Sequence, residues 1–404
     1  MKNILYIGDY IEGQPRIASI RYDDIMKEIS KEFNIVCIND SKNISNSIYS
    51  IKDFKFISGE LDKNKLKQSM SNNNIKNIIK KSMLYKWYKI FTLSNNRFNK
   101  INYKLYEDIF KYLDNNTIDC IFISVPTIYP IYILKEIKKK YPNIKVVIEI
   151  RDIINSKLFK DYPQFILKNA EKDIIRYSDT IIALSEGIKK YYEKLKYKNK
   201  IITITNGFNY EKFIDFKKDN DIKKKNELTF THLGSIYGGR NLKDFVLGLN
   251  DLSKSTNKNI VLNLIGNLDS IAELELKESL KLNTSSLQVN RIGLVPHDKA
   301  LEFLRKSDYA VILTHRTGSD YAIPGKTFEY IGAYKPIIAV TEDKELIELI
   351  NNKFGFCAMH ERHDIFLQLT KLINKDFDYS NREEFSRNNK IKSIISVINE
   401  ITKF

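Results

Sequence analysis

The stretch Tyr309–Val340, YAVILTHRTGSDYAIPGKTFEYIGAYKPIIAV, decides the fold of this chain. It opens with the apolar run Tyr309–Leu313 and closes with the apolar run Pro336–Val340, each of the length of a buried strand. Between them lies a polar loop and then Pro324, which suits the first position of a helix that we expect to end near Tyr334. The order strand, loop, helix, strand predicts a parallel sheet, and α/β folds bind their ligands at the carboxyl edge of such a sheet.

Lys326 and Glu329 are three positions apart, so we expect both side chains on one face of the first turns of this helix. A lysine suits a phosphate, a carboxylate suits hydroxyl groups, and the N-terminal end of a helix attracts negative charge. The pair therefore predicts a site for a ligand that carries both phosphate and hydroxyl groups. An ordinary lysine–glutamate pair on a helix surface is the alternative interpretation.

The run Ile323–Tyr330, IPGKTFEY, followed by Lys335-Pro336, resembles the donor-binding helix of glycosyltransferase family 4, whose members have the GT-B fold. In that family the helix carries two glutamates eight positions apart, and the second one binds the ribose of a nucleotide sugar. Glu329 matches the second glutamate, whereas Tyr321 stands at the position of the first. The chain is similar instead to a subgroup that reads P-x-K-x-x-E-Y. The resemblance leaves open whether Tyr321 alters or abolishes activity.

Length and composition limit the possible classes of protein. The 404 residues favour two domains, and 43% apolar residues are enough for two cores. Three cysteines and five histidines lie far apart without a C-x-x-C, so neither a disulfide framework nor a metal cluster is expected. Two D-x-D matches, Asp219–Asp221 and Asp376–Asp378, lie in charged polar stretches, and we interpret them as chance. The amino terminus lacks the pattern of a signal peptide and no apolar run approaches the ~20 residues that span a bilayer, so we expect a cytoplasmic protein.

The first half of the chain reads as alternating strands and helices. The expected elements are the strands 3–7, 34–38, 118–125, 145–150, 180–184 and 201–205, with a helix at about 19–30 after the first strand. The loop after that first strand contains no G-x-G-x-x-G, so a dinucleotide fingerprint is absent. Arg16 and Arg21 could meet a phosphate at this edge of the sheet, and solvated basic side chains are the alternative.

The pair Arg151-Asp152 follows the strand Lys145–Ile150 directly and resembles the R-D motif of the same subgroup, which lies on the acceptor side. By that resemblance Arg16, Arg151 and Asp152 are acceptor-side residues, and Asp152 is the candidate catalytic or acceptor-orienting carboxylate. A helix N-cap is the alternative role for Asp152. The run Glu171–Phe213, with E-K, S-D, S-x-G and N-G-F in succession, also resembles family 4.

The segment 63–104 holds eleven lysines or arginines and no acidic residue, with aromatic residues between them that include Trp87, the only tryptophan. Three interpretations remain open. The segment is an interfacial one that contacts anionic lipid or a lipid-linked acceptor, a basic helix packed on its own domain, or a nucleic-acid patch. The first predicts peripheral attachment at the inner face of the plasma membrane.

In the second half, the strand Thr229–Leu233 leads into the glycine-rich loop Gly234–Arg240, whose small residues let a ligand approach the backbone. By resemblance to family 4, Arg240 and Lys243 hold the donor diphosphate, although the usual spacing of these basic residues is not reproduced. The pattern G-x-V-P also resembles the edge that binds the base, and His297 after it either covers the nucleobase or is an exposed loop histidine. The expected donor-binding residues are Gly234, Ser235, Gly239, Arg240, Gly266, Val295, His297, Ser319, Pro324, Gly325, Lys326, Thr327 and Glu329.

The resemblance implies an α/β chain of the GT-B architecture, in which two Rossmann-like domains with parallel sheets face a central cleft. We expect an acceptor-binding domain at 1–215, with a basic aromatic insert at 55–105. A linker is expected at 216–227, a nucleotide-sugar-binding domain at 228–380, and a helix that crosses back to the first domain at 381–404.

The implied reaction moves a sugar from a nucleoside diphosphate sugar, UDP-linked, to a glycan or lipid-linked acceptor. Bacterial surface polysaccharide synthesis, such as that of capsule or lipopolysaccharide, is the expected setting. Anomeric configuration is retained without a metal or other cofactor, and Asp152, Arg240 and Lys326 are the expected catalytic residues. A non-catalytic GT-B-like subunit of a polysaccharide assembly complex and a GT-B-like sugar-nucleotide epimerase are the alternatives. Nucleic-acid binding would rest on the formal net charge of +16 alone, so no nucleic acid is expected as a partner.

Overall fold

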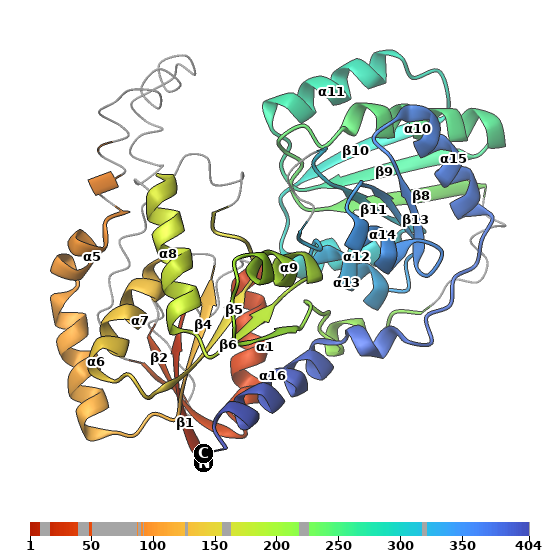
Figure 1. The fold of residues 1–404 in the computed structure, drawn as a ribbon. Helices are drawn as coiled ribbons and strands as arrows, with labels where there is room; N and C mark the ends of the chain where they lie inside the picture. The colour runs from red at the N-terminus through yellow and green to blue at the C-terminus, as the bar shows by residue number, and fades with distance from the viewer. Residues whose placement is uncertain are drawn as a thin grey trace. The chain divides into compact units, whose positions relative to one another are not determined.

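The computed structural model describes residues 1–8, 17–38, 48–50, 87, 90–91, 93–125, 128–155, 163–217, 226–316 and 321–403. The chain divides into two compact units, which Figure 1 shows as ribbons. Unit 1 comprises Met1–Leu184, Ile188–Thr203 and Ile394–Phe404, and unit 2 comprises Ser185–Gly187 and Ile204–Ser393.

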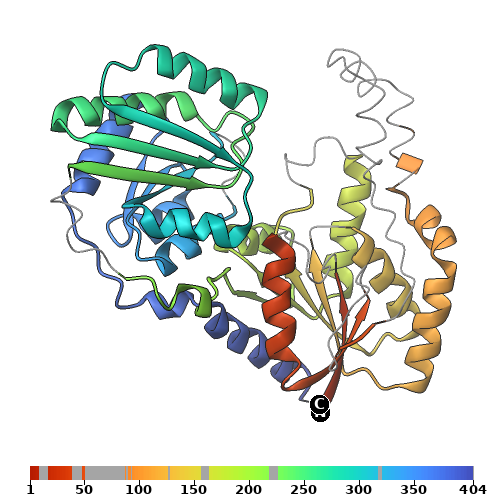
Figure 2. The same ribbon diagram turned by 180° about the vertical axis from the view of Figure 1, so that it is seen from behind.

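Unit 1 is built on a parallel sheet in the strand order β3-β2-β1-β4-β5-β6-β7. The strands are β1 (Lys2–Ile7), β2 (Phe33–Ile38), β3 (Ile48–Ser50), β4 (Cys120–Val125), β5 (Lys145–Ile150), β6 (Thr180–Ala183) and β7 (Lys200–Thr203). Its described helices include α1 (Ile17–Ile29), α5 (Asn95–Ile101), α6 (Tyr103–Asn115), α7 (Tyr129–Lys140), α8 (Gln164–Tyr177) and α9 (Glu186–Lys194). Helices α7 and α8 cover one face of the sheet and α1 covers the other (Figure 1, Figure 2). Every residue of β4 and β6 is buried, because both faces of these strands are covered.

Unit 2 is built on a six-stranded parallel sheet in the order β10-β9-β8-β11-β12-β13. The strands are β8 (Glu227–Leu233), β9 (Asn259–Ile265), β10 (Leu287–Gly293), β11 (Tyr309–Leu313), β12 (Ile337–Val340) and β13 (Gly355–Ala358). Its helices are α10 (Leu242–Thr256), α11 (Ser270–Lys281), α12 (His297–Lys306), α13 (Lys326–Gly332), α14 (Lys344–Ile350) and α15 (Arg362–Ile373). The predicted parallel α/β architecture is confirmed in both units. Because β8 and β11 are neighbours at the centre, the loops that follow them meet at one edge of this sheet.

Three glycines bring the strand ends of unit 2 into close contact. The Gly234 N–H donates to the Ile265 carbonyl at 2.7 Å, and the Gly266 N–H donates to the Gly293 carbonyl at 2.8 Å. Gly266 has a φ of +128°, and a Cβ on it would lie 2.5 Å from the carbonyl carbon of Gly234. A side chain at residue 266 is therefore excluded. The packing of the strand ends thus requires a glycine at 266 whether or not Gly234 and Gly266 bind a donor, as the sequence predicts.

The donor helix predicted from Pro324 to about Tyr334 is shorter than expected, because α13 spans Lys326–Gly332. The Thr327 N–H donates to the Pro324 carbonyl at 2.9 Å, so the chain enters the helix through a tight turn, and Pro324 lies before the N-cap Gly325 rather than at the first helical position. Beyond the helix, Tyr334 has a φ of +55°, a left-handed conformation that ends the helical geometry.

The predicted terminal helix 381–404 is interrupted. A 3₁₀ turn at Arg382–Phe385 precedes α16, which spans Arg387–Ile401. The buried Arg382 guanidinium donates to the carbonyls of Gly332 at 2.8 Å and Phe213 at 3.0 Å, and these bonds fix the 3₁₀ turn on unit 2. The domain and linker boundaries at 215, 216–227 and 228 stay predictions; residues 218–225 lie outside the described part of the chain.

Only part of the basic aromatic segment 63–104 is described, and its end at 93–101 packs against α7. Phe98 is buried and stacks on Tyr129 with 5.0 Å between ring centroids, and the Leu93 carbonyl accepts from the Tyr132 hydroxyl at 2.7 Å. Trp87 is 63% exposed. The packing interpretation therefore holds for residues 93–101, while the rest of the insert at 55–86 falls outside the described residues. None of the helices in the described ranges combines the length and the apolar character needed to cross a membrane.

Candidate donor site at the carboxyl edge of unit 2

Two cations lie at the carboxyl edge of the unit 2 sheet, where β8 and β11 end. Lys326 is the first residue of α13, and Arg240 closes the glycine-rich loop that joins β8 to α10. The positive charges of Arg240 and Lys326 act on each other, because Arg240 contributes to lowering the pKa of the Lys326 ammonium. The structure thus brings together two of the residues that the sequence predicted as diphosphate ligands.

The Lys326 ammonium is held against the end of β8. Its Nζ lies 3.2 Å from Nε2 of His232, a fully buried histidine at the next-to-last position of that strand. A Cβ on Gly234, which has a φ of +97°, would lie 3.3 Å from the same Nζ. The missing side chain at Gly234 therefore leaves the space into which the lysine reaches. Burial first, and Arg240 second, lower the pKa of Lys326 to about 7, while Glu329 opposes this.

His232 is neutral and accepts the hydrogen bond from Lys326. Its Nδ1 lies 3.1 Å from the Val311 carbonyl, which can only accept, so Nδ1 carries the hydrogen and Nε2 keeps a lone pair. Burial, and then the positive charges of Lys326 and Arg240, hold the pKa of His232 well below its usual value. The carbonyls of Val311 and Gly234 offset only part of this effect.

Arg240 is held in a similar way. Its Nε and Nη2 atoms both lie 3.4 Å from Nε2 of His315, whose Nδ1 is 3.3 Å from the Gly238 carbonyl. The Arg240 guanidinium also lies over the ring of Tyr237, 4.2 Å from its centroid, and Nη1 donates to the Ser235 carbonyl at 3.4 Å. Burial lowers the pKa of Arg240 and Tyr237 opposes the shift, while a guanidinium stays charged in proteins.

Glu329 lies on the side of the site that carries α12. Its Oε1 accepts from Nε2 of His297 at 2.9 Å, and His297 is the first residue of α12. Both side chains are partly exposed, at 21% for Glu329 and 27% for His297. Val295, two residues earlier, packs against the core of unit 2. The predicted ribose ligand and the predicted base-side histidine are therefore direct neighbours.

Tyr330 braces the two central strands beneath the cations. Its buried hydroxyl accepts from the Leu233 N–H at 2.9 Å and donates to the Val311 carbonyl at 3.2 Å. Tyr330 lies in the middle of α13, and its hydroxyl thus connects the end of β8 to β11. These two hydrogen bonds fix the position of α13 relative to the strand that leads into the glycine-rich loop.

The other predicted donor residues are two hydroxyl side chains, two glycines and one lysine. Ser235 accepts from the Asn267 N–H at 3.2 Å, and Thr327 is fully buried. Gly239 has a φ of +71° and open space around it, and a Cβ on Gly325 would lie 2.9 Å from the Asn206 amide nitrogen. The ammonium of Lys243, the second basic residue predicted for the diphosphate, donates instead to Glu278 of α11 at 2.7 Å.

Two predicted site residues, Ser319 on the donor side and Arg16 on the acceptor side, lie outside the described residues.

The acceptor-side residues of unit 1 follow β5. Arg151 extends the pairing of β4 and β5, because its backbone N–H donates to the Val125 carbonyl at 3.1 Å, and its guanidinium lies 5.4 Å from the ring centroid of Tyr22. Asp152 comes next, and burial raises the pKa of its carboxyl group while Arg151 opposes the shift. A carboxyl group with a raised pKa is a reasonable proton acceptor near neutral pH.

Arg21 is buried and paired with a carboxylate, so both interpretations of the sequence, a phosphate ligand and a solvated basic side chain, are wrong for this residue. Its side chain is 3% exposed and donates to Oε1 of Glu149, which is 0% exposed, at 2.5 Å. Glu149 also accepts from the Tyr22 hydroxyl, which lies 2.5 Å from the Ser124 hydroxyl. This buried cluster joins α1 to β4 and β5 at the carboxyl edge of the unit 1 sheet.

The sequence interpretation missed His232 and Glu149, and it named Tyr330 and His315 without giving either residue a role. His232 stands in the run TFTHLG, where a histidine surrounded by strand residues and followed by the glycine loop is the one available signal. In the described part of the chain, no cluster of three or more histidine, cysteine, aspartate or glutamate side chains could hold a metal ion.

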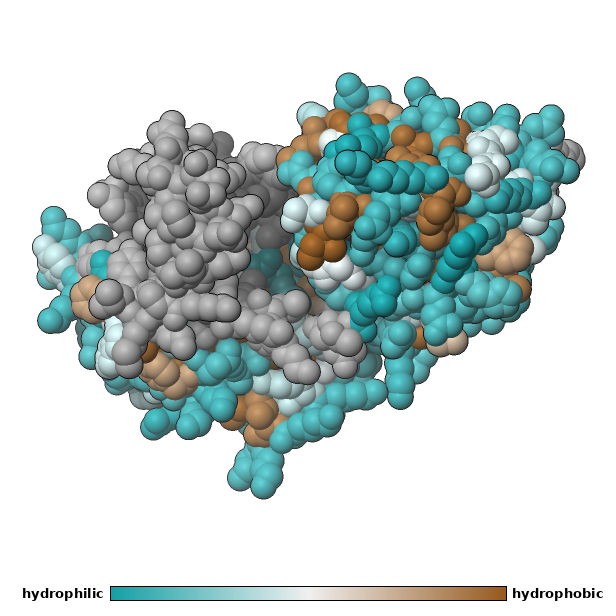
Figure 3. All heavy atoms as spheres, turned by 90° about the horizontal axis from the view of Figure 1, so that it is seen from above, coloured by the Kyte–Doolittle hydropathy of each residue, from teal (hydrophilic) through white to brown (hydrophobic). Residues whose placement is uncertain are grey.

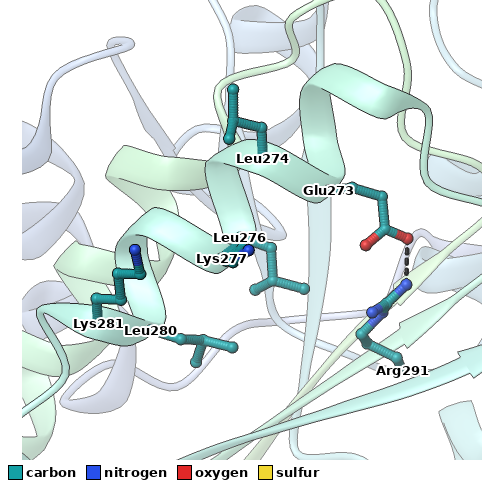
Figure 4. A pocket seen from close by; sticks show the side chains of 7 residues that line it. All are labelled: Glu273, Leu274, Leu276, Lys277, Leu280, Lys281 and Arg291. Carbon is teal, nitrogen blue, oxygen red and sulfur yellow. Dashed lines mark hydrogen bonds and ion pairs between the residues drawn. The ribbon is translucent and has the colours of Figure 1, made fainter.

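A separate groove of about 650 Å³ lies between α11 and β10 (Figure 4). Its lining residues are Glu273, Leu274, Leu276, Lys277, Leu280, Lys281 and Arg291. Glu273 and Arg291 form an ion pair at its end, and Leu274 is 57% exposed. In Figure 3, which views the molecule from the side of α11, apolar side chains interrupt the polar surface of unit 2. The groove shares no lining residue with the cluster around Arg240 and Lys326.

Comparison with known proteins identifies the fold. No family model and no curated protein sequence matches the chain. Among solved structures, sucrose-phosphate synthase from Thermosynechococcus elongatus superimposes with a TM-score of 0.65 at 11% identity, covering 100% of both chains. A UDP-forming trehalose-phosphate synthase from Burkholderia xenovorans gives 0.65 at 9% identity over 99% of both chains. The fold is GT-B.

A putative UDP-N-acetylglucosamine 2-epimerase from Listeria monocytogenes is also similar, with a TM-score of 0.59 at 11% identity over 100% of this chain and 97% of the other. GT-B proteins thus include both of the enzyme classes that the sequence left open. At these identities the likeness extends to the fold, so the roles of Arg240, Lys326 and Glu329 are argued below from their chemistry.

Proposed function

We propose that the chain is a retaining glycosyltransferase that moves a sugar from a UDP-linked donor to a glycan or lipid-linked acceptor in bacterial surface polysaccharide synthesis. The observation that carries this proposal is that two cations, Arg240 and Lys326, each contact the imidazole of a histidine at the carboxyl edge of the unit 2 sheet and act electrostatically on each other. The carboxylate of Glu329 lies on the same short helix as Lys326. One ligand with a diphosphate and vicinal hydroxyls would satisfy all three groups.

Transfer of a sugar from a nucleoside diphosphate requires positive charge beside the leaving group. As the glycosidic bond breaks, negative charge grows on the departing diphosphate, and preorganised cations stabilise that charge in a partly dry site. Arg240 offers a planar fork of donors and Lys326 a compact charge. In the proposed mechanism these two residues take the place of a metal ion.

The donor is proposed to bind with its ribose on Glu329 and its base beside His297. A carboxylate accepts hydrogen bonds from two vicinal hydroxyls, and the Glu329 Oε1 atom is already oriented by the His297 Nε2–H at 2.9 Å. The match to the UDP-forming trehalose-phosphate synthase supports UDP as the nucleotide. On the acceptor side, Asp152 is proposed to orient the acceptor hydroxyl, and the hydroxyl proton leaves with the departing diphosphate, as retention in a single substitution step requires.

The proposal extends to the acceptor and to the membrane. The basic and aromatic composition of 63–104 supports a lipid-linked acceptor and contact with anionic lipid through this segment. Flotation with vesicles of phosphatidylglycerol and phosphatidylcholine, in comparison with phosphatidylcholine alone, tests this part. Binding to neither kind of vesicle would remove it without touching the donor site.

The decisive experiment for the activity is a panel of UDP-sugars incubated with the protein in EDTA, with the nucleotide and the sugar products followed separately. A transferase releases UDP, and release increases when the correct acceptor is added. An epimerase converts the UDP-sugar into its epimer, and UDP stays attached. A non-catalytic subunit does neither, although it binds the nucleotide. The proposal predicts UDP release in EDTA, and epimer formation without release would contradict it.

A further inference from the structure

We infer that His232 and His315 are positioning residues, which hold Lys326 and Arg240 for a donor diphosphate by accepting hydrogen bonds without cancelling their charge. This inference rests on the proposed donor site and identifies what prepares its cations. It begins from a repeated arrangement. In each pair a cation donates to the Nε2 atom of an imidazole, and the Nδ1 atom of that imidazole faces a backbone carbonyl.

A glycine of the same loop makes room for each pair. A Cβ on Gly234 would lie 3.3 Å from the Lys326 ammonium, and a Cβ on Gly238 would lie 2.8 Å from Cε1 of His315. Both glycines have positive φ angles, +97° and +67°. The backbone of the glycine-rich loop therefore lies close to both Lys326 and His315. The two cation–histidine pairs are thus arranged around one loop.

The choice of imidazole over carboxylate has a physical consequence. A carboxylate at His232 would also accept from Lys326, but its charge would neutralise the cation and weaken its attraction for a phosphate. A neutral imidazole fixes the position of the ammonium and leaves a full positive charge when the lysine is protonated. Glu329, the nearest carboxylate identified around Lys326, is itself engaged with His297.

The arrangement also links donor binding to proton uptake. The charged and titratable groups that act on the Lys326 ammonium are His232 from β8, Arg240 from the glycine-rich loop and Glu329 from α13. With Arg240 nearby and burial around it, Lys326 has a pKa of about 7, so part of the population is uncharged at neutral pH. A bound diphosphate favours the ammonium form. At pH 8, binding should therefore take up protons from solution, up to about one per bound diphosphate.

The test measures UDP binding by calorimetry at pH 8 in two buffers of different ionisation enthalpy, which counts protons, with the whole protein and four variants. H232Q keeps a neutral acceptor at the place of Nε2, H232L removes the acceptor, and H232E replaces it by a charge. H363Q, which changes an exposed histidine of α15, is the matched control. Thermal unfolding shows whether each variant is folded.

The inference predicts that H232Q and H363Q bind UDP within about threefold of the natural protein, and that H232L binds about 10–100-fold more weakly. H232E should lose the proton uptake, because a neighbouring carboxylate raises the pKa of Lys326. If H232L fails to fold, H232Q and H232E decide between a positioning role and a merely structural one.

Two outcomes separate this inference from the proposed function. If UDP binds to the natural protein with no proton uptake, and H232E binds with the same affinity and proton count, the positioning role is wrong while the donor site stands. If UDP does not bind at all between pH 6 and pH 8, the donor site and the inference both fail.

Discussion

Replacing Lys326 by alanine removes one of the two cations that the account assigns to the departing diphosphate. The ammonium reaches the edge of the site through the space left by Gly234, and its described hydrogen bond is to the neutral Nε2 of His232. Its charge is thus available to a ligand. Loss of one preorganised group of this kind lowers kcat by about 10²–10³, which corresponds to about 2.7–4 kcal/mol of transition-state stabilisation.

The assay is UDP release from the accepted UDP-sugar at pH 6.5, where most Lys326 side chains carry a proton given a pKa of about 7. The variant K281A, which changes a lysine of the α11 groove, serves as the matched control because it removes the same charge elsewhere in unit 2. The account expects kcat to fall in K326A with a smaller change in KM, since charge on the diphosphate is largest in the transition state. A K326A variant with turnover within threefold of K281A would refute the reasoning.

Three further predictions follow from single contacts. The affinity for UDP should fall by up to tenfold per pH unit above about pH 7, as Lys326 loses its proton; titration calorimetry from pH 7 to 9 checks this, and an affinity that rises with pH in this range would contradict it. The variant E149Q should lose about 3–5 kcal/mol in urea denaturation, because it leaves the buried Arg21 guanidinium without its carboxylate, and a loss below 1 kcal/mol would show that the pair is dispensable. The variant K335M should lower stability by about 1–3 kcal/mol, since the buried Lys335 ammonium donates to the Ser307 carbonyl at the end of α12; thermal unfolding with an unchanged midpoint would speak against this bond.

The alternation of strands and helices could be predicted because some central strands, such as β11 and β12, are continuous apolar runs. The expected strands Tyr309–Leu313 and Lys145–Ile150 are β11 and β5 to the residue. Each is followed directly by a polar residue, Thr314 or Arg151. The start of α13 was predicted two residues too early. Proline favoured position 324 locally, but a tight turn between Pro324 and Thr327 delays the helix.

The candidate site could be predicted only where a residue's role follows from its place along the chain. Lys326 and Glu329 share a short helix after a buried strand, and that spacing is visible in the sequence. His232 supports Lys326 across 94 positions, and Lys243 meets Glu278 on another helix, so both pairings depend on how helices and strands pack. The pairing of the buried Arg21 with Glu149 also depends on packing, because the two residues are far apart in the sequence and no neighbour of Arg21 indicates a buried partner.

The most direct measurement of the central claim is thermal unfolding of the natural protein and of E329A with a panel of nucleoside diphosphates, in EDTA. A ligand present at about 100 times its Kd adds ~2.7 kcal/mol to the stability of the folded state. The account predicts that UDP raises the unfolding temperature of the natural protein, and that E329A loses this shift while its own unfolding temperature without ligand stays close to normal. If no nucleoside diphosphate shifts the natural protein, or if E329A responds to UDP as the natural protein does, the donor site proposed around Lys326 and Glu329 is contradicted.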